Sequence, residues 1–281
     1  MIKKDYAYSM ARFIAIIMVI FCHIFEYTGY HLGYGVLFER FGNFLSVGVQ
    51  IFLLLSGILY GSRDSLKERP TEFFLRNCKK VMLDYYVYAF LVIIPVYTFF
   101  EPNVILFLKR VFRLGTLSGV ISGVHHTWFI PYILFCYVIT PYLYDIRDFA
   151  KEKLWMALIS LFVLFEVIKV AFNLRFTATW INCYILGFFI PKLSENCSKH
   201  DKSVLVCLCS IVSIFSLCVR YIVRYHISPL VDGNFLSRIC NYVVSSTKSF
   251  DGLTILLLII TLYKLWEAKI GTPLGFKSSC T

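Results

Sequence analysis

Two ionisable residues within a long apolar run, Arg12 and His23, are the first candidates for chemistry. Histidine can accept and return a proton near neutral pH, and arginine binds phosphate or carboxylate groups. In one α-helix the two side chains would lie within about 20° of the same face and about 16 Å apart along the axis. An ionisable side chain inside a hydrocarbon layer is costly unless it is paired or faces water. The spacing therefore predicts one helix face that carries both an anion-binding group and a proton-transfer group.

A structural role for the same pair is also open. Arg12 could extend to the inner headgroups, and His23 could hydrogen-bond a neighbouring carbonyl. Glu26, one turn after His23, favours the functional interpretation, because a carboxylate there could fix the imidazole tautomer or raise its basicity. The same carboxylate could instead lie in water at the outer rim of the helix.

A second candidate segment reads His125-His126-Thr-Trp128-Phe129. Adjacent histidines point in different directions on a regular backbone, so at most one of them faces a site and a shared metal ion is not expected. No Cys/His spacing elsewhere indicates a metal. Trp128 and Phe129 either anchor the chain at a membrane interface or form the apolar wall of a site for a sugar or acyl group.

The composition indicates that membrane-spanning helices position these residues. Hydrophobic residues make up 58% of the 281-residue chain and charged residues 16%, whereas a soluble chain is about half apolar and about a quarter charged. A soluble enzyme, a disordered tail and a secreted disulfide scaffold are therefore not expected. The net charge of +11 arises from short basic clusters between apolar runs, so nucleic acid is not an expected partner.

Apolar runs of about 20 residues predict an all-α, polytopic transmembrane helix bundle with about eight spans. The predicted spans are Ser9–Tyr27, Phe44–Gly61, Val81–Phe100, Thr127–Tyr144, Leu154–Phe172, Thr177–Pro191, Val204–Val223 and Leu253–Trp266. The stretch Val104–Val124 is interrupted by basic residues and is predicted to lie on the membrane surface or dip partly into it. The segment Ser62–Lys80 is predicted to be a basic loop. Cysteines within the apolar runs are predicted to act as small hydrophobic residues.

The basic loops also predict the orientation. With the N-terminus in the cytoplasm, most of the loop Lys and Arg residues are cytoplasmic, as the positive-inside rule expects. We therefore expect a multi-pass protein of the inner (cytoplasmic) membrane, with the lipid bilayer as a partner. Arg220 and Arg224, near the outer end of the seventh span, are expected to meet lipid headgroups, or else phosphate or sugar groups outside the membrane.

Together these motifs resemble the membrane-bound acyltransferase 3 family, whose members transfer acyl groups, commonly acetyl, to cell-surface carbohydrates. The resemblance extends over roughly residues 5–270, and its specific motifs lie in the first half of the chain. The motifs that carry the resemblance are Arg12 and His23 in R-x10-H spacing, Val49-Gln-Ile-Phe52-Leu-Leu-Leu-Ser56-Gly57, Phe73-Phe74-Leu75-Arg76-Asn-Cys-Lys79-Lys80, and His126-Thr-Trp128-Phe129-Ile130. The resemblance implies that His23 is the catalytic residue and that Arg12 is required with it.

The resemblance implies an integral membrane O-acyltransferase of bacterial type. It would move an acyl group, with acetyl expected, from cytoplasmic acyl-CoA to a hydroxyl of an extracytoplasmic polysaccharide or glycolipid, such as lipopolysaccharide or capsule. No bound cofactor is expected, because acyl-CoA (acetyl-CoA) is the donor substrate. Its phosphates are expected to bind Arg12 and the basic residues Arg69, Arg76, Lys79 and Lys80. The acceptor would enter beside the segment that carries His126 and Trp128.

Three details of this resemblance are open. Lys79 stands where the family often has a second arginine, so the charge is kept but the bidentate geometry is not. His23 could act as a general base, a role worth about 10² to 10⁴ in rate, or its imidazole could be transiently acylated. Ser56 and the amides near Gly57 could stabilise the oxyanion, although close helix packing at Ser56-Gly57 is the favoured interpretation.

The C-terminus departs from the family pattern. Family members usually have about ten helices of membrane-spanning length, and a late helix carries a Ser/Tyr-rich run that ends in histidine. The expected organisation here is a membrane domain at 1–269 and a short tail at 270–281, which resembles a truncation or frameshift remnant. An inactive truncated family member is therefore one alternative. A carrier for a lipid-linked sugar or an acyl donor is another, because inward-facing Arg, His and Glu also line transport pathways.

Overall fold

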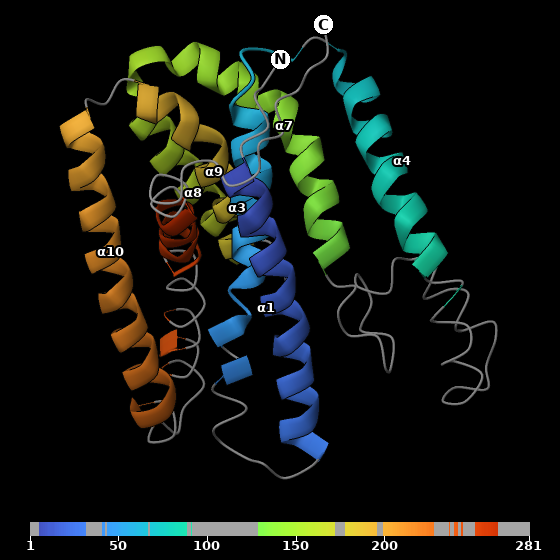
Figure 1. Cartoon of the computed structure of the whole chain (residues 1–281). Coiled ribbons are helices and arrows are strands. Elements are labelled where there is room, and N and C mark those ends of the chain that lie inside the picture. The colour runs from blue at the N-terminus through green and yellow to red at the C-terminus, as the bar shows by residue number, and fades with distance from the viewer. Residues whose placement is uncertain are drawn as a thin grey trace, which may run out of the picture. The chain divides into compact units, whose positions relative to one another are not determined.

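The computed structural model describes residues 6–31, 41–42, 44–66, 68–88, 91, 129–171, 178–195, 199–227, 236, 239–240, 243 and 251–263. Over these residues the chain forms helices and short turns with no strand, which confirms the predicted all-α class. The described helices, shown in Figure 1, are α1 (Tyr6–His31), α3 (Gly48–Gly61), α4 (Pro70–Tyr88), α7 (Ile130–Ala150), α8 (Leu154–Ala171), α9 (Ala178–Glu195), α10 (Lys199–Ile222) and helix 251–263 (Asp251–Tyr263).

The chain divides into two compact units. Unit 1 comprises Met1–Leu59 and Phe162–Thr281, and unit 2 comprises Tyr60–Leu161. A 3-10 turn, Lys151–Lys153, links α7 to α8, and a π-helical turn, Val223–Ile227, follows α10.

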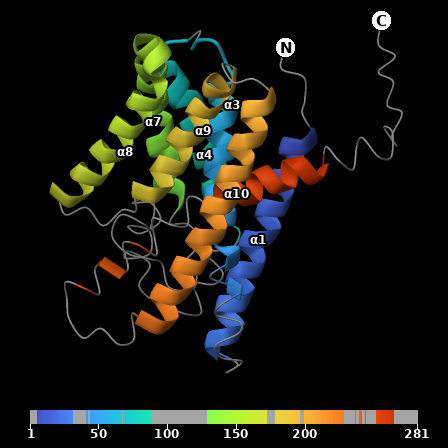
Figure 2. The ribbon, with the colours of Figure 1, turned by 90° about the vertical axis from the view of Figure 1, so that its left-hand side faces the viewer.

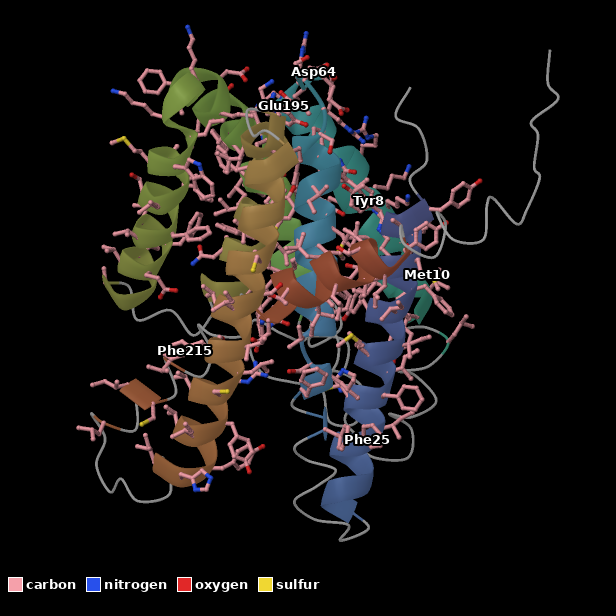
Figure 3. The ribbon with its side chains drawn as sticks, turned by 60° about the vertical axis from the view of Figure 1, so that its left-hand side comes forward. Tyr8, Met10, Phe25, Asp64, Glu195 and Phe215 are labelled. Carbon is pink, nitrogen blue, oxygen red and sulfur yellow. The ribbon has the colours of Figure 1, made fainter. Side chains whose placement is uncertain are left out.

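Two described helices are long and apolar enough to cross a membrane by length and composition. They are Tyr6–Phe25 within α1 and Ser210–Ile227 within α10 and its π-helical turn, and shorter apolar helices occur at Gly48–Gly61, Leu154–Ile168 and Asp251–Tyr263. Apolar side chains such as Met10 and Phe215 project outward from the ribbon (Figure 3), with 44% and 69% of their surface exposed. Apolar side chains exposed along a helix suit lipid rather than water. The fold is thus consistent with a helical membrane bundle.

Most predicted spans correspond to described helices. Each of α1, α3, α7, α8, α9, α10 and helix 251–263 overlaps one predicted span. The ends differ because α7 continues past Tyr144 to Ala150 and α9 continues past Pro191 to Glu195. The stretch Val104–Val124 and the tail 270–281 lie outside the described residues. The number of spans and their orientation stay predictions.

The prediction of a loop over Ser62–Lys80 is wrong in its second half. Helix α4 begins at Pro70, where the missing N–H of proline costs nothing because the first N–H groups of a helix have no partner within it. Glu72 in the first turn complements the positive end of the helix dipole. The packing of α4 against α7 (Figure 1) then holds the helix. The side chain of Phe73 on α4 is fully buried. Basic residues assigned to a loop therefore lie on a helix face.

Helix α3 makes close backbone contacts within unit 1. A Cβ atom added at Gly57 would lie 2.7 Å from the amide nitrogen of Phe188 and would also meet the carbonyl oxygen of Tyr184, both on α9. A Cβ at Gly187 would meet the carbonyl oxygen of Leu54 on α3. Small residues that let two backbones approach are the usual means of helix packing in membranes. This contact confirms the packing interpretation of Gly57.

Other elements of unit 1 also pack closely on α3. A Cβ at Gly48 would lie 2.7 Å from the carbonyl oxygen of Ala15 on α1, and a Cβ at Gly252 would lie 2.6 Å from Cβ of Gln50. Figure 2 shows helix 251–263, drawn in red, lying crosswise to α10. Helix α3 therefore packs against α1, α9 and helix 251–263 within unit 1. A glycine or another small residue lies at each of these contacts.

Candidate functional site

Arg12 and His23 lie on the same continuous helix, α1. Its buried positions, Ala7, Ala11, Ala15, Met18 and Cys22, recur at the three- and four-residue spacing of one helix face. Arg12 and His23 each follow a buried residue by one position, and both are half-buried. They therefore lie along the same flank of α1, at the edge of the packed face. The predicted common register of the two side chains is confirmed by the unbroken helix from Tyr6 to His31.

The opposite side of α1 is apolar and exposed. Phe13, Ile16, Ile20 and Ile24 have 44% to 57% of their surface accessible. Arg12 and His23 therefore lie between the exposed apolar surface of α1 and its buried face. Helix α1 also contains Glu26, but its side chain lies outside the described residues.

Ser56 lies on α3 and is half-buried. It directly precedes Gly57, which packs against α9 within unit 1. His126 and Trp128 lie outside the described residues, whereas Phe129 precedes α7 and is 45% exposed. Among the described residues no three His, Cys, Asp or Glu side chains gather as metal ligands do.

Basic residues of unit 2 share one face of α4. Arg76, Lys79 and Lys80 lie three and four residues apart, which puts them on neighbouring positions of a helix surface, and all three are exposed. Arg76 pairs with Glu68 at 2.6 Å. Arg69 stands just before the helix, faces Glu72 at 4.0 Å and is 84% exposed. Of the four predicted donor-binding cations in unit 2, the structure therefore groups three on α4 and places Arg69 just before its first turn.

An aromatic cluster lies beside this basic face. Tyr60 at the end of α3, Phe73 on α4 and Tyr137 on α7 pack edge to face, and the ring centroids of Tyr60 and Phe73 are 5.3 Å apart. The hydroxyl of Tyr60 donates to Oδ1 of Asn77 at 3.0 Å, while Nδ2 of Asn77 donates to the carbonyl of Phe73 at 2.8 Å. Such edge-to-face pairs stabilise by about 0.5–1.5 kcal/mol beyond their buried area.

Two arginines stand over this aromatic cluster. The guanidinium carbon of Arg63 lies 5.0 Å from the ring centroid of Tyr60, and that of Arg76 lies 5.8 Å from the ring centroid of Phe73. Both distances suit cation–π attraction. Arg63 follows the end of α3 and was not among the predicted site residues. Sequence alone shows it only as one more cation of the basic segment.

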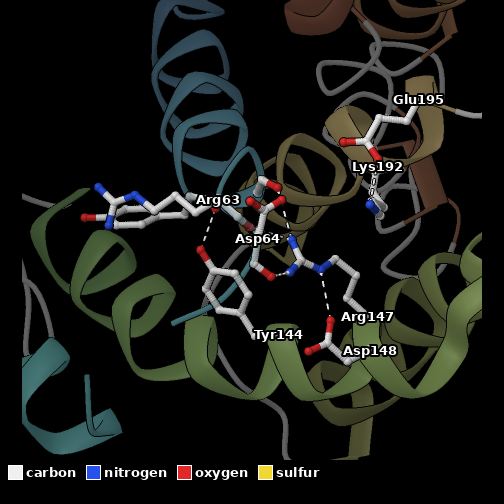
Figure 4. Close-up of polar contacts among 9 residues, drawn as sticks. Arg63, Asp64, Tyr144, Arg147, Asp148, Lys192 and Glu195 are labelled. Atoms are coloured by element: carbon white, nitrogen blue, oxygen red, sulfur yellow. Dashed lines mark hydrogen bonds and ion pairs between the residues drawn. The ribbon is translucent and has the colours of Figure 1, made fainter. Parts of the chain in front are cut away.

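Arg147 on α7 holds the segment that carries Arg63. Its side chain is 5% exposed and donates to the carbonyl oxygens of Gly61 at 3.1 Å and Arg63 at 2.9 Å, and also to that of Asp64 (Figure 4). These carbonyls end α3 and begin the connection to α4, where helix carbonyls lack partners and carry partial negative charge. A cation buried here is thus satisfied by backbone acceptors.

Tyr144, one turn before Arg147, adds a fourth bond to this arrangement. Its hydroxyl donates to the carbonyl of Tyr60 at 2.5 Å, and the guanidinium carbon of Arg147 lies 4.8 Å from its ring centroid. Asp148 accepts a hydrogen bond from Nε of Arg147 at 3.4 Å. The predicted span ends at Tyr144, whereas α7 continues to Ala150, and the structure buries Arg147 within this helix. The i, i+3 spacing of Tyr144 and Arg147 was the signal that could have found the pair.

The expectation that Arg220 meets outer headgroups or sugar groups is wrong. Arg220 is buried on α10 and its guanidinium forms an ion pair with the buried carboxylate of Asp251 on helix 251–263. A buried charge is tolerated when an opposite charge is hydrogen-bonded to it. The side chain of Arg224 lies outside the described residues. Of the cysteines predicted to act as small hydrophobic residues, Cys22, Cys136 and Cys183 are buried, whereas Cys207 and Cys218 are exposed.

The fold and these features define a helical membrane protein with ionisable residues on an apolar helix. The sequence matches the acyltransferase domain model of the acyltransferase 3 family over residues 5–270. The chain therefore belongs to this family of membrane acyltransferases. No curated protein and no solved structure matches the chain.

Proposed function

We propose that this membrane acyltransferase moves an acetyl group from acyl-CoA on the cytoplasmic side to a hydroxyl of a polysaccharide or glycolipid on the other side of the inner membrane. The observation that carries the proposal is the position of Arg12 and His23 on one flank of the continuous helix α1. That flank offers a cation and a proton acceptor about 16 Å apart along the helix axis.

The donor end of the proposed site is basic. Acyl-CoA carries phosphates, and guanidinium groups bind phosphate through charge-assisted hydrogen bonds. Arg76, Lys79 and Lys80 form an exposed basic face on α4, which supports a role in donor binding together with Arg69 and Arg12. Glu68 engages one nitrogen of Arg76, and the guanidinium retains further donors for a phosphate.

The reaction itself is proposed to depend on His23. A neutral imidazole removes the proton of the acceptor hydroxyl as that oxygen attacks the thioester carbonyl, and CoA thiolate leaves with the proton returned to it. Glu26 is proposed to orient the imidazole, and His126 and Trp128 to contact the acceptor. Ser56 is proposed as an oxyanion donor, a role compatible with its half-buried position on α3.

The central test replaces His23 in the purified full chain. His23→Ala should lower the rate of labelled acetyl transfer from acetyl-CoA to a polysaccharide acceptor by about 10²-fold to 10⁴-fold. His226→Ala provides a matched control, because His226 is an exposed histidine in the turn after α10. If His23→Ala transfers acetyl at the wild-type rate, and both variants fold equally well, His23 has no part in the mechanism.

A carrier for a lipid-linked sugar or an acyl donor is the second candidate. It is favoured by the half-buried positions of Arg12 and His23, because inward-facing ionisable residues also line transport pathways. Reconstituted vesicles separate the two candidates. Appearance of labelled acetyl on the acceptor supports transfer, whereas movement of intact acceptor across the vesicle without acetylation supports the carrier.

A further inference from the structure

We infer that Arg63 is a second phosphate-binding residue of the donor site, beside Arg76, and that Arg147 is the positioning residue that holds it there. This inference rests on the proposed use of acyl-CoA as donor. It adds two residues of unit 2 that none of the sequence motifs contains. The ligand class is an organic phosphate, of which the phosphate groups of CoA are the expected example.

Arg63 and Arg76 rest on the same aromatic cluster. Arg63 lies over the ring of Tyr60 and Arg76 lies over the ring of Phe73, while those two rings pack edge to face with centroids 5.3 Å apart. A guanidinium stacked on a ring keeps its N–H groups at its edge, where they can meet phosphate oxygens. Both side chains are exposed, so an anionic ligand can reach them.

Helix α7 fixes the backbone of Arg63. Arg147 donates to the carbonyl oxygen of Arg63 itself at 2.9 Å, and also to those of Gly61 and Asp64 on either side. The hydroxyl of Tyr144 holds the carbonyl of Tyr60, whose ring lies beneath Arg63. Two side chains one turn apart therefore fix both the backbone of Arg63 and the residue on which its guanidinium rests.

The local charge favours a second phosphate-binding cation beside Arg76. Arg147 itself is buried and its donors are taken up by carbonyls and Asp148, so it is not placed to bind a ligand. The guanidinium of Arg76 already forms an ion pair with Glu68. A phosphate that met Arg76 alone would meet a partly neutralised cation, and Arg63 supplies the additional charge. Preorganised cations bind phosphate more tightly because less ordering accompanies binding.

The test measures the dissociation constant of CoA for the purified full chain in neutral-lipid nanodiscs. Arg63→Gln should weaken CoA binding about tenfold or more, the effect of losing a hydrogen bond between charged groups. Arg76→Gln serves as the benchmark for the donor site. Lys153→Gln is the matched control, since it removes an exposed cation of unit 2 from the turn after α7 and should leave the constant unchanged.

A double-variant cycle tests the positioning role. Arg147→Gln should weaken CoA binding, and adding it to Arg63→Gln should produce no further loss, because Arg147 acts through Arg63. A merely structural role would instead lower the thermal midpoint and weaken binding equally in both backgrounds. If Arg147→Gln fails to fold, Arg147→Lys and Tyr144→Phe replace it, because each removes only part of the hydrogen-bonded arrangement.

The outcomes separate this inference from the proposed function. Weakened binding by Arg76→Gln but not by Arg63→Gln would overturn the role of Arg63 alone. Absence of CoA binding by the wild type would overturn the donor assignment and the role of Arg63 with it. Loss of association with anionic-lipid vesicles in Arg63→Gln, at unchanged CoA affinity, would identify lipid headgroups as the phosphate source and overturn the assignment to CoA. Independent, additive effects would overturn the positioning role of Arg147.

Discussion

Arg220 on α10 and Asp251 on helix 251–263 form an ion pair, and both side chains are buried within unit 1. The pair joins segments that are 31 residues apart in sequence. Because hydrocarbon and packed protein solvate an isolated charge poorly, the charge of each side chain is stabilised by the opposite charge of its partner. The ion pair therefore links α10 to helix 251–263 and stabilises their packing within unit 1.

Asp251→Ala should destabilise the protein by about 3–5 kcal/mol, because it leaves the guanidinium of Arg220 buried without its carboxylate. The double replacement Arg220→Met with Asp251→Leu should be much less harmful, since it removes both charges and keeps apolar volume. Thermal unfolding of the detergent-purified variants measures the difference. An equal loss in the single and double variants would contradict a dominant role for charge pairing.

Gly57→Ala and Gly187→Ala should each lower stability by about 1–3 kcal/mol, because the added methyl group would overlap the backbone of the facing helix. The affected contact joins α3 and α9 within unit 1. Ser160→Ala, at an exposed position of α8, is a suitable control. The thermal midpoints of the three variants check the prediction, and an unchanged midpoint for both glycine variants would show that the helices can separate without cost.

Lys79→Arg should strengthen donor binding. The substitution keeps the charge of the α4 face and restores a planar, bidentate donor three residues after Arg76. A second bidentate contact should lower the KM for acetyl-CoA severalfold while leaving the KM for the acceptor unchanged. Steady-state kinetics with each substrate varied in turn would show the difference. Lys192→Arg, on an exposed side chain of α9 that pairs with Glu195, controls for a general effect of added arginine.

Tyr60→Phe should cost about 1 kcal/mol of stability, since it deletes the hydrogen bond to Asn77 but leaves the aromatic cluster in place. Phe73→Ala should cost about 3–5 kcal/mol, because it empties a fully buried position between α4 and α7. Unfolding midpoints of the two variants provide the comparison. A larger effect of Tyr60→Phe than of Phe73→Ala would mean that the hydroxyl, rather than the packed rings, holds α4.

Local pattern predicted the helical class and the register of α1 because both depend on residues close together in sequence. A run of apolar residues as long as Tyr6–Phe25 has few alternatives to a helix in lipid, where every backbone group needs an internal partner. The helical period then fixes the relation of Arg12 to His23 without any tertiary contact. The start of α4 at Pro70 was not predicted, because the charged residues after it interrupt the apolar pattern from which the helices were predicted.

The sequence by itself determined the apolar helices, the flank shared by Arg12 and His23, and the resemblance to the acyltransferase 3 family. Only the tertiary structure decided that Arg147 caps α3 and that Arg220 pairs with Asp251. The carbonyl oxygens of Gly61 and Arg63 lie 86 and 84 positions from Arg147 in the chain, so no local period relates them. The residue type of a cation does not show whether its side chain faces water, lipid headgroups or buried carbonyls, because tertiary packing sets which acceptors surround it.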